Sequence, residues 1–258
     1  MAETAILKAR ARRALFLGGL PPAGVSRARV NQQRSGTMRF DLHVHTYQSR
    51  DSWAKPEEII QAAARRGLDG LAITDHNTID GALELCEIAP FRVIVGEEVG
   101  TGEGEIIGLF LQEPIPAGLS PDETVAAIHD QGGLVYVPHP WDRLRRHAAL
   151  SSGARERLVA QVDAVEVFNA RVTLSRDNAL AREFALAHGL AMGAGSDAHM
   201  AAEIGSAYVE MEAFHDAASF LAALRRGQVV GRLASPLVHF QTTVAKLHWR
   251  ITGKRSIR

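Results

Sequence analysis

The 258-residue sequence contains a single cysteine, Cys86, and aromatic residues make up only 6% of the chain. One cysteine excludes an intramolecular disulfide, which is typical of a reducing compartment, so we expect a cytoplasmic location. No apolar run approaches the roughly 20 residues that a membrane-spanning helix requires, and we expect no membrane partner. The formal net charge is zero, so the chain as a whole lacks the charge signature of a nucleic-acid-binding protein.

Charge is nevertheless placed unevenly, because both ends of the chain are basic. Residues 1–37 are rich in Arg, Gly, Pro, Gln and Ser, and they hold one acid, Glu3. Such a leader resembles a transit peptide, but Met38 directly precedes the first strand-like run, so we expect 1–37 to be a disordered or misassigned extension. Residues 236–258 contain no acid and predict a basic terminal helix or tail. Residues 38–235 then form the folded domain.

Strand-like and helix-like segments alternate through this domain. Short apolar runs predict strands at 40–45, 70–74, 91–95, 105–111, 134–137, 164–168, 190–194 and 208–211. Capping signals and amphipathic spacing predict helices at 57–66, 78–88, 121–132, 177–188 and 213–226. Repeated βα units predict an α/β fold with a parallel sheet, most simply a closed barrel. The glycine-rich segment 100–104 predicts a turn between strands, since it lacks the lysine of a phosphate-binding loop.

Histidines and carboxylates gather at the ends of these predicted strands. Side chains alternate along a strand, so Asp41, His43 and His45 share one face. Two buried imidazoles without partners cost free energy, and a metal ion satisfies both. His43 and His45 are therefore predicted ligands, and Asp41 is either a ligand or a partner that fixes an imidazole tautomer.

In two pairs of adjacent residues, the side chains must point to opposite faces of the strand. In Asp75-His76 the neighbours face opposite ways, and we expect His76 to be the ligand and Asp75 to orient it or a neighbouring ligand. In Glu97-Glu98 only one carboxylate faces the mouth of the barrel, where it can bridge two cations.

The remaining groups complete a candidate metal cluster. His139 lies between two prolines after a strand-like run, Asp197 and His199 share a face, and Asp51 occupies a nearby loop. Imidazoles and carboxylates are ligands for zinc, iron and manganese alike. Ser196 is not expected to be a nucleophile, because the G-x-S-x-G pattern is absent.

In order, the runs DLHVHT with SRDS, ITDHN, GEE, PHP and GSDAH resemble the motifs of the PHP family (polymerase and histidinol phosphatase), from Met38 to about Met211. The segment 165–171 is similar to the small stand-alone PHP phosphoesterases. The resemblance implies a distorted seven-stranded (β/α) barrel whose metal site lies at the C-terminal ends of the strands. It also implies two or three divalent ions (Mn, Zn or Fe) and hydrolysis of a phosphate ester.

The resemblance further implies how the ligands divide among the ions. Glu98 matches the family's bridging glutamate better than Glu97 does. One ion would be held by His43, His45, Glu98 and Asp197, a second by Glu98 and His139, and a third by Asp51, His76 and His199. Many relatives place a further His or Cys on the second ion, and the candidates in its place are Asn169 and Glu166.

The expected substrate is a small phosphorylated molecule, such as a metabolite, a nucleotide or a short oligonucleotide. Arg143 and Arg171 are expected to neutralise phosphoryl oxygens, because guanidinium groups bind them bidentately. His76 or a metal-bound water would protonate the leaving group. Two alternatives remain open: an amidohydrolase-like enzyme that cleaves a non-phosphate bond, and a non-catalytic, metal-stabilised binding module. The sequence does not reveal the oligomeric state.

Overall fold

The computed structural model describes residues 36–145 and 147–235, together with residues 244, 247 and 251. The predicted extension 1–37, apart from its last two residues, lies outside this part of the chain. The basic segment 236–258 also lies outside it, apart from the three residues named. Among the described residues, no helix has both the length and the apolar character needed to cross a membrane.

The described part of the chain contains one sheet of nine strands, in the order β7-β6-β5-β4-β3-β2-β1-β8-β9. The strands are β1 (Thr37–Val44), β2 (Gly70–Ile73), β3 (Arg92–Thr101), β4 (Gly104–Leu109), β5 (Leu134–Val137), β6 (Ala164–Asn169), β7 (Ala191–Gly195), β8 (Ala207–Glu212) and β9 (Gln228–Gly231). The β1–β2–β3 and β5–β6–β7 pairings are parallel, as predicted. The sheet is mixed where the sequence predicted a parallel one, because β4, β8 and β9 pair antiparallel with their neighbours. The tight turn after Thr101 forces β4 to run back along β3.

The sheet curls into a nearly closed barrel, which confirms the predicted architecture with nine strands in place of seven. Closure occurs at the carboxyl end of β1, where Val44 forms a parallel bridge with Ala198. The backbone N–H of His45 donates to the Ala198 carbonyl at 2.9 Å. The segment that follows β7 therefore lies against the end of β1, although the two are far apart in sequence.

Helices surround this sheet, and local sequence explains their ends. Ser120 caps the helix that follows it, because its Oγ accepts a hydrogen bond from the Glu123 N–H at 3.2 Å. Gly67 and Gly189 end two others in the left-handed conformation, at φ 63° and 64°. The short helix α5 and strand β9 had not been predicted. The helices are α2 (Pro56–Arg66), α3 (Asp80–Ile88), α4 (Pro121–Asp130), α5 (Ser152–Leu158), α6 (Ser175–His188) and α7 (Ala217–Leu224), with 3-10 turns η1 (Val159–Gln161) and η2 (Ala201–Glu203).

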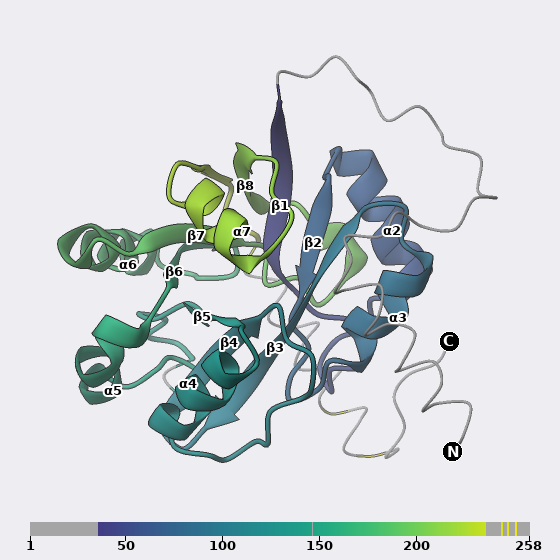
Figure 1. The fold of residues 1–258 in the computed structure, drawn as a ribbon. Helices are drawn as coiled ribbons and strands as arrows, with labels where there is room; N and C mark the ends of the chain where they lie inside the picture. Colours follow the sequence, from purple (N-terminus) through teal and green to yellow (C-terminus); the bar gives the residue numbers. More distant parts are fainter. Residues whose placement is uncertain (1–35, 146, 236–243, 245–246, 248–250, 252–258) are drawn as a thin grey trace.

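Two apolar clusters hold helices and sheet together. Figure 1 shows α2 and α3 beside β1–β3, and α4, α5 and α6 on the other side of the molecule. Ile59 of α2 and Ile128 of α4 are fully buried in the larger cluster, whereas Phe220 of α7 belongs to a second cluster with Phe40 of β1. Each such side chain stabilises the fold by about 1.5–3 kcal/mol. Because the helices anchor the strands, the loops at the strand ends are held in place.

Candidate metal centre

His43 and His45 lie fully buried at the end of β1, and their Nε2 atoms are 3.1 Å apart. The Nδ1 of His43 lies 3.1 Å from Oε1 of Glu166, and since a carboxylate only accepts, His43 donates from Nδ1. The Nδ1 of His45 lies 3.2 Å from Oγ of Ser49, whose proton goes to Asp75 at 2.6 Å. When both rings are neutral, the two Nε2 lone pairs face each other, and a cation bound by both would satisfy them.

Glu98 lies at the centre of the cluster and uses its two oxygens in different directions. Its Oε2 lies 3.5 Å from His43 Nε2, 3.4 Å from His45 Nε2 and 3.1 Å from His76 Nδ1. Its Oε1 lies 3.0 Å from Nε2 of His139. Burial by itself would raise the pKa of Glu98, but the imidazoles of His43 and His76 hold this pKa well below its usual range. An ionised carboxylate with imidazoles on both sides is suited to bridging two cations.

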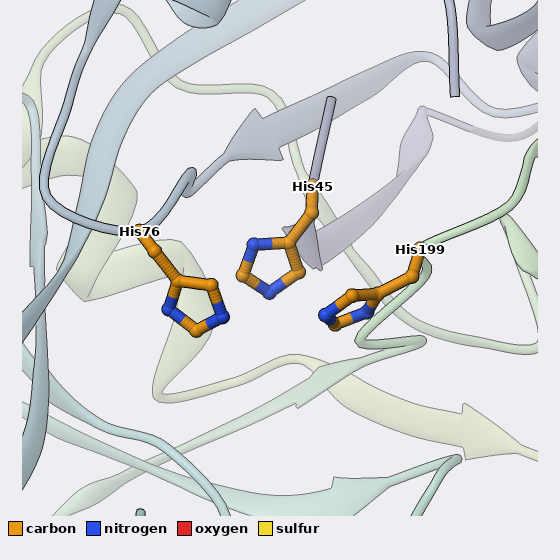
Figure 2. Close-up of side chains that lie close together, drawn as sticks. All are labelled: His45, His76 and His199. Atoms are coloured by element: carbon orange, nitrogen blue, oxygen red, sulfur yellow. The ribbon is translucent and has the colours of Figure 1, made fainter. Parts of the chain in front are cut away.

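Figure 2 shows the rings of His45, His76 and His199 turned toward one another from three separate segments of the chain. Asp51 joins them, because its Oδ1 lies 3.6 Å from His76 Nε2 and 3.3 Å from His199 Nε2. Burial, with the His199 imidazole, lowers the pKa of His45 to about 3. His45 is therefore neutral at physiological pH, which is the protonation state that binds a metal ion.

Asp197 divides its carboxylate between the imidazoles and two hydrogen-bond donors. Its Oδ1 lies 3.5 Å from His45 Nε2 and 3.4 Å from His199 Nδ1. Its Oδ2 accepts from Arg145 Nη1 at 2.7 Å and from Asn169 Nδ2 at 3.2 Å. This arrangement leaves one oxygen directed at the imidazoles and holds the other in place.

Glu105 of β4 is a member of the cluster that the sequence analysis missed. Its Oε2 lies 3.8 Å from His139 Nε2, and its Oε1 lies 3.8 Å from His76 Nδ1. Burial and the neighbouring Glu98 raise the pKa of Glu105 to about 7. The register contains a signal that could have found it. Ile107 pairs with Glu98, so Glu105, two residues away on the same strand, shares the face of Glu98.

Hydrogen bonds show which residue of each adjacent pair, Glu97-Glu98 and Asp75-His76, faces the cluster. Glu97 points away from the cluster, and its Oε2 accepts from the Ile115 N–H at 2.8 Å. Asp75 accepts from the hydroxyl of Ser49, which in turn contacts Nδ1 of His45. Asp75 therefore orients a neighbouring ligand, one of the two roles considered for it.

Asp41 and Asn169 contact the backbone and other side chains around the cluster. Asp41 accepts from the backbone N–H groups of His43, Ser196 and Gly205 at 3.3, 2.8 and 2.9 Å, and burial raises its pKa to about 6. Neither imidazole nitrogen of His43 contacts it. Asn169 Nδ2 donates to two carboxylates, and its Oδ1 accepts from a backbone N–H at 2.9 Å. In this arrangement Asn169, one of the two candidates for the missing ligand of the second ion, supplies hydrogen-bond donors to the cluster.

The three arginines near the cluster have different environments. Arg143 is 43% exposed and pairs through Nε with Asp177 at 2.8 Å, on the N-terminal turn of α6. Arg171 is buried, and its Nη1 lies 3.4 Å from the carbonyl of Asp197. Arg145, which the sequence analysis did not single out, contacts the Asp197 carboxylate directly. Its Nη2 is buried without a hydrogen-bond partner among the described residues.

Three non-glycine residues at the cluster have positive φ angles. They are Asn77 at 55°, His139 at 27° and Asp197 at 53°. Such conformations cost on the order of 1–3 kcal/mol each and persist only where surrounding contacts impose them. Their concentration here is typical of a functional site.

Five imidazoles and four carboxylates thus converge from loops and strand ends that span residues 43 to 199. The five imidazoles and three of the carboxylates, Glu98, Glu105 and Asp197, form four overlapping groups in which the donor atoms lie within 4.8 Å of one another. The fourth carboxylate, Asp51, lies against His76 and His199. The facing Nε2 atoms of His43 and His45 and the ionised Glu98 fit divalent cations, in keeping with this donor chemistry. An α/β barrel with such a centre at its strand ends defines a class of metal-binding barrel protein.

Comparison with known proteins places the chain within that class. The PHP domain model matches residues 41–179, more than half of the chain, and the PHP-associated model matches residues 175–229. The chain therefore belongs to the PHP domain family.

Individual relatives agree with this assignment. The uncharacterized protein MJ1587 of Methanocaldococcus jannaschii is 42% identical over 147 residues, which cover 52% of this chain and 82% of that protein. A phosphoribosyl 1,2-cyclic phosphate 1,2-diphosphodiesterase of Eggerthella lenta is 38% identical over 86 residues, covering 30% and 32%. The crystal structure of a two-domain protein from Bacteroides vulgatus, described as containing a predicted PHP-like metal-dependent phosphoesterase, shares the fold. Its TM-score is 0.59 at 18% identity, over 81% of this chain and 70% of that one.

Proposed function

We propose that this protein is a metal-dependent phosphoesterase that acts on a small metabolite, a nucleotide or a short oligonucleotide. The observation that carries the proposal is the convergence of the predicted ligand set, with Glu98 between two groups of imidazoles. Family membership supports a metal-dependent hydrolase, and the phosphodiesterase of Eggerthella lenta supports phosphate-ester chemistry.

The ligands would divide among the ions largely as the resemblance implies. His43, His45, Glu98 and Asp197 would hold a first ion, Glu98, His139 and Glu105 a second, and Asp51, His76 and His199 a third. Zinc, iron and manganese all suit this mixture of imidazole and carboxylate donors. When bound, the ions would supply an activated hydroxide and neutralise charge on the phosphoryl group.

The protein's own residues would bind and orient the phosphoryl group. Arg145 takes the role expected of Arg143 and Arg171, because it alone of the three contacts the carboxylate of a proposed ligand. Its Nη2, next to that contact, is buried without a hydrogen-bond partner among the described residues. Both ring nitrogens of His76 face carboxylates of Asp51 and Glu98. His76 therefore fits a ligand better than the acid that protonates the leaving group.

A hydrolysis assay with added Mn²⁺ tests the proposal. The wild-type protein should release phosphate from an aryl phosphate ester, and His43→Ala should lower kcat/KM by more than about 100-fold. His215→Ala is the matched control, because His215 is 82% exposed and distant in its contacts from the cluster, and it should retain wild-type activity. Cleavage of aryl amides or carboxylic esters in place of every phosphate ester would instead favour the amidohydrolase-like alternative.

A further inference from the structure

Glu166 of β6 is fully buried, and its two oxygens serve two of the proposed ligands. Its Oε1 accepts from Nδ1 of His43 at 3.1 Å. Its Oε2 accepts from the backbone N–H of His139 at 2.8 Å and from Nδ2 of Asn169 at 2.9 Å. Asn169 continues the chain of contacts to Asp197 at 3.2 Å. One carboxylate thereby contacts β1 and the loop after β5 directly, and through Asn169 it is connected to the loop after β7.

We propose that Glu166 is a positioning residue that prepares His43 and His139 for metal binding without itself being a ligand. The inference rests on the proposed function, in which these two histidines serve different ions. It assigns a role to a residue that the sequence left as an alternative ligand of the second ion.

The first part of this role concerns the tautomer of His43. Because Glu166 only accepts, it holds the proton of a neutral His43 on Nδ1. The lone pair is then on Nε2, the nitrogen that faces Glu98 and His45. A carboxylate behind an imidazole ligand also increases the basicity of that ligand.

The second part concerns the backbone of His139. This residue has φ 27°, in the left-handed region that non-glycine residues avoid. The hydrogen bond from its N–H to Glu166 helps to impose that conformation, in which Nε2 of His139 reaches Oε1 of Glu98 at 3.0 Å. Without this acceptor, one of the contacts that stabilise the positive φ of His139 is lost.

Glu166→Gln is the sharpest test, because it keeps the size of the side chain and replaces an acceptor with a donor. The amide then offers one oxygen where three donors need acceptors, and its NH₂ group favours a His43 protonated on Nε2. We expect Mn²⁺ binding, measured by titration calorimetry, to weaken about 10–100-fold. Glu166→Asp keeps the charge but is shorter by one methylene, and it should also weaken binding if geometry is what matters.

Glu97→Gln is the matched control, since Glu97 is an equally buried carboxylate on a strand but faces away from the cluster. It should bind Mn²⁺ as the wild type does. A second readout is the tautomer of the neutral His43 ring in the metal-free protein, measured by ¹⁵N NMR. The measurement is made at a pH high enough to deprotonate the imidazolium, because burial by itself would lower the pKa of His43, but Glu166 and Glu98 raise this pKa well above its usual value. The wild type should show a proton on Nδ1, and Glu166→Gln should shift the proton toward Nε2, which loss of structural support alone would not do.

The possible failures are distinguishable. A folded Glu166→Gln protein that binds Mn²⁺ within about threefold of the wild type would overturn the inference and leave the proposed function intact. A neutral wild-type His43 ring that carries its proton on Nε2 would also overturn it, even if the Gln variant did not fold. A wild-type protein that binds no Mn²⁺ would refute the proposed function together with this inference.

Discussion

Arg143 and Arg145 lie two positions apart in one loop, but their side chains have different partners. Arg143 is 43% exposed and pairs with Asp177. Arg145 lies between two carboxylates, with Nε 2.7 Å from Asp142 Oδ2 and Nη1 2.7 Å from Asp197 Oδ2. Asp142 therefore holds the Arg145 guanidinium through Nε, and Asp197 holds it through Nη1. The remaining Nη2 is the donor that we assign to a phosphoryl oxygen.

Replacing Arg145 should therefore impair substrate binding and turnover. Arg145→Ala is expected to lower kcat/KM for an aryl phosphate by about 10²–10³-fold, a magnitude typical of a lost charge-stabilising donor. Arg145→Lys should recover only part of this loss, because an ammonium cannot replace the fork of a guanidinium. Steady-state kinetics in saturating Mn²⁺ measure both effects.

Arg143→Ala is the control for this pair and should stay close to wild type in kcat and KM. Mn²⁺ titration of Arg145→Ala separates two causes, because the variant also removes a partner of Asp197. Equal activity of the two alanine variants would contradict the assignment of Arg145.

Most members of the cluster could be predicted from sequence, because they lie at strand ends and because side chains alternate along a strand. Parity along a strand placed His43 beside His45, and the strand-end position indicated His139. Glu105 was not predicted as a member of the cluster, because its position depends on the register of β4 against β3, which the turn at 101–104 sets. Arg145 was not predicted either, because the loop between Pro140 and α5 has no periodicity that indicates where its side chains point.

At the scale of elements, the strand ends bring the ligands together, and the end of β7 lies close against two of the residues involved, His43 and Glu166. A Cβ added at Gly195 would collide with the Cβ of His43 and lie 2.6 Å from Oε1 of Glu166. Glycine therefore permits the end of β7 to approach β1 and β6 where the ligands lie. The same approach could not be predicted from sequence, because a glycine before Ser196 is equally consistent with an ordinary turn.

Gly195→Ala is expected to destabilise the fold by about 1–3 kcal/mol, because neither a backbone nor a buried carboxylate can move away cheaply. Urea unfolding of the metal-free protein measures this change. Gly153→Ala is the matched control: it lies in α5, nothing lies within 4 Å of the added Cβ, and alanine favours helix. The control should be neutral or slightly stabilising, and a Gly195→Ala protein as stable as that control would contradict the close approach.

The predicted elements were mostly correct in kind and less so in pairing. The strand 134–137 matches β5 residue for residue, and the proline and acids after Ser120 correctly indicated α4. The helix predicted at 213–226 is limited to Ala217–Leu224, because Asp216 caps it through the Ser219 N–H at 2.7 Å. Strand β9 is short and only partly buried, so its weak apolar pattern gave no prediction.

At the scale of the whole molecule, the barrel brings residues that are far apart in sequence close together in space. His43 and His199 are separated by most of the folded domain, yet both lie near Asp197 Oδ1, at 3.8 and 3.4 Å respectively. The bridge between Val44 and Ala198 closes the sheet at this point. Imidazoles and buried carboxylates placed this closely form the kind of donor set that suits divalent cations.

The most direct test of this account is the metal content of the purified protein. Elemental analysis after loading with Mn²⁺ and exhaustive dialysis should find more than one ion per chain in the wild type. His45→Ala should retain fewer ions, because His45 belongs to two of the overlapping donor groups, while His215→Ala should retain the wild-type content. A wild-type protein without bound ions, or a His45→Ala protein with the full content, would contradict the convergence of these residues into one metal centre.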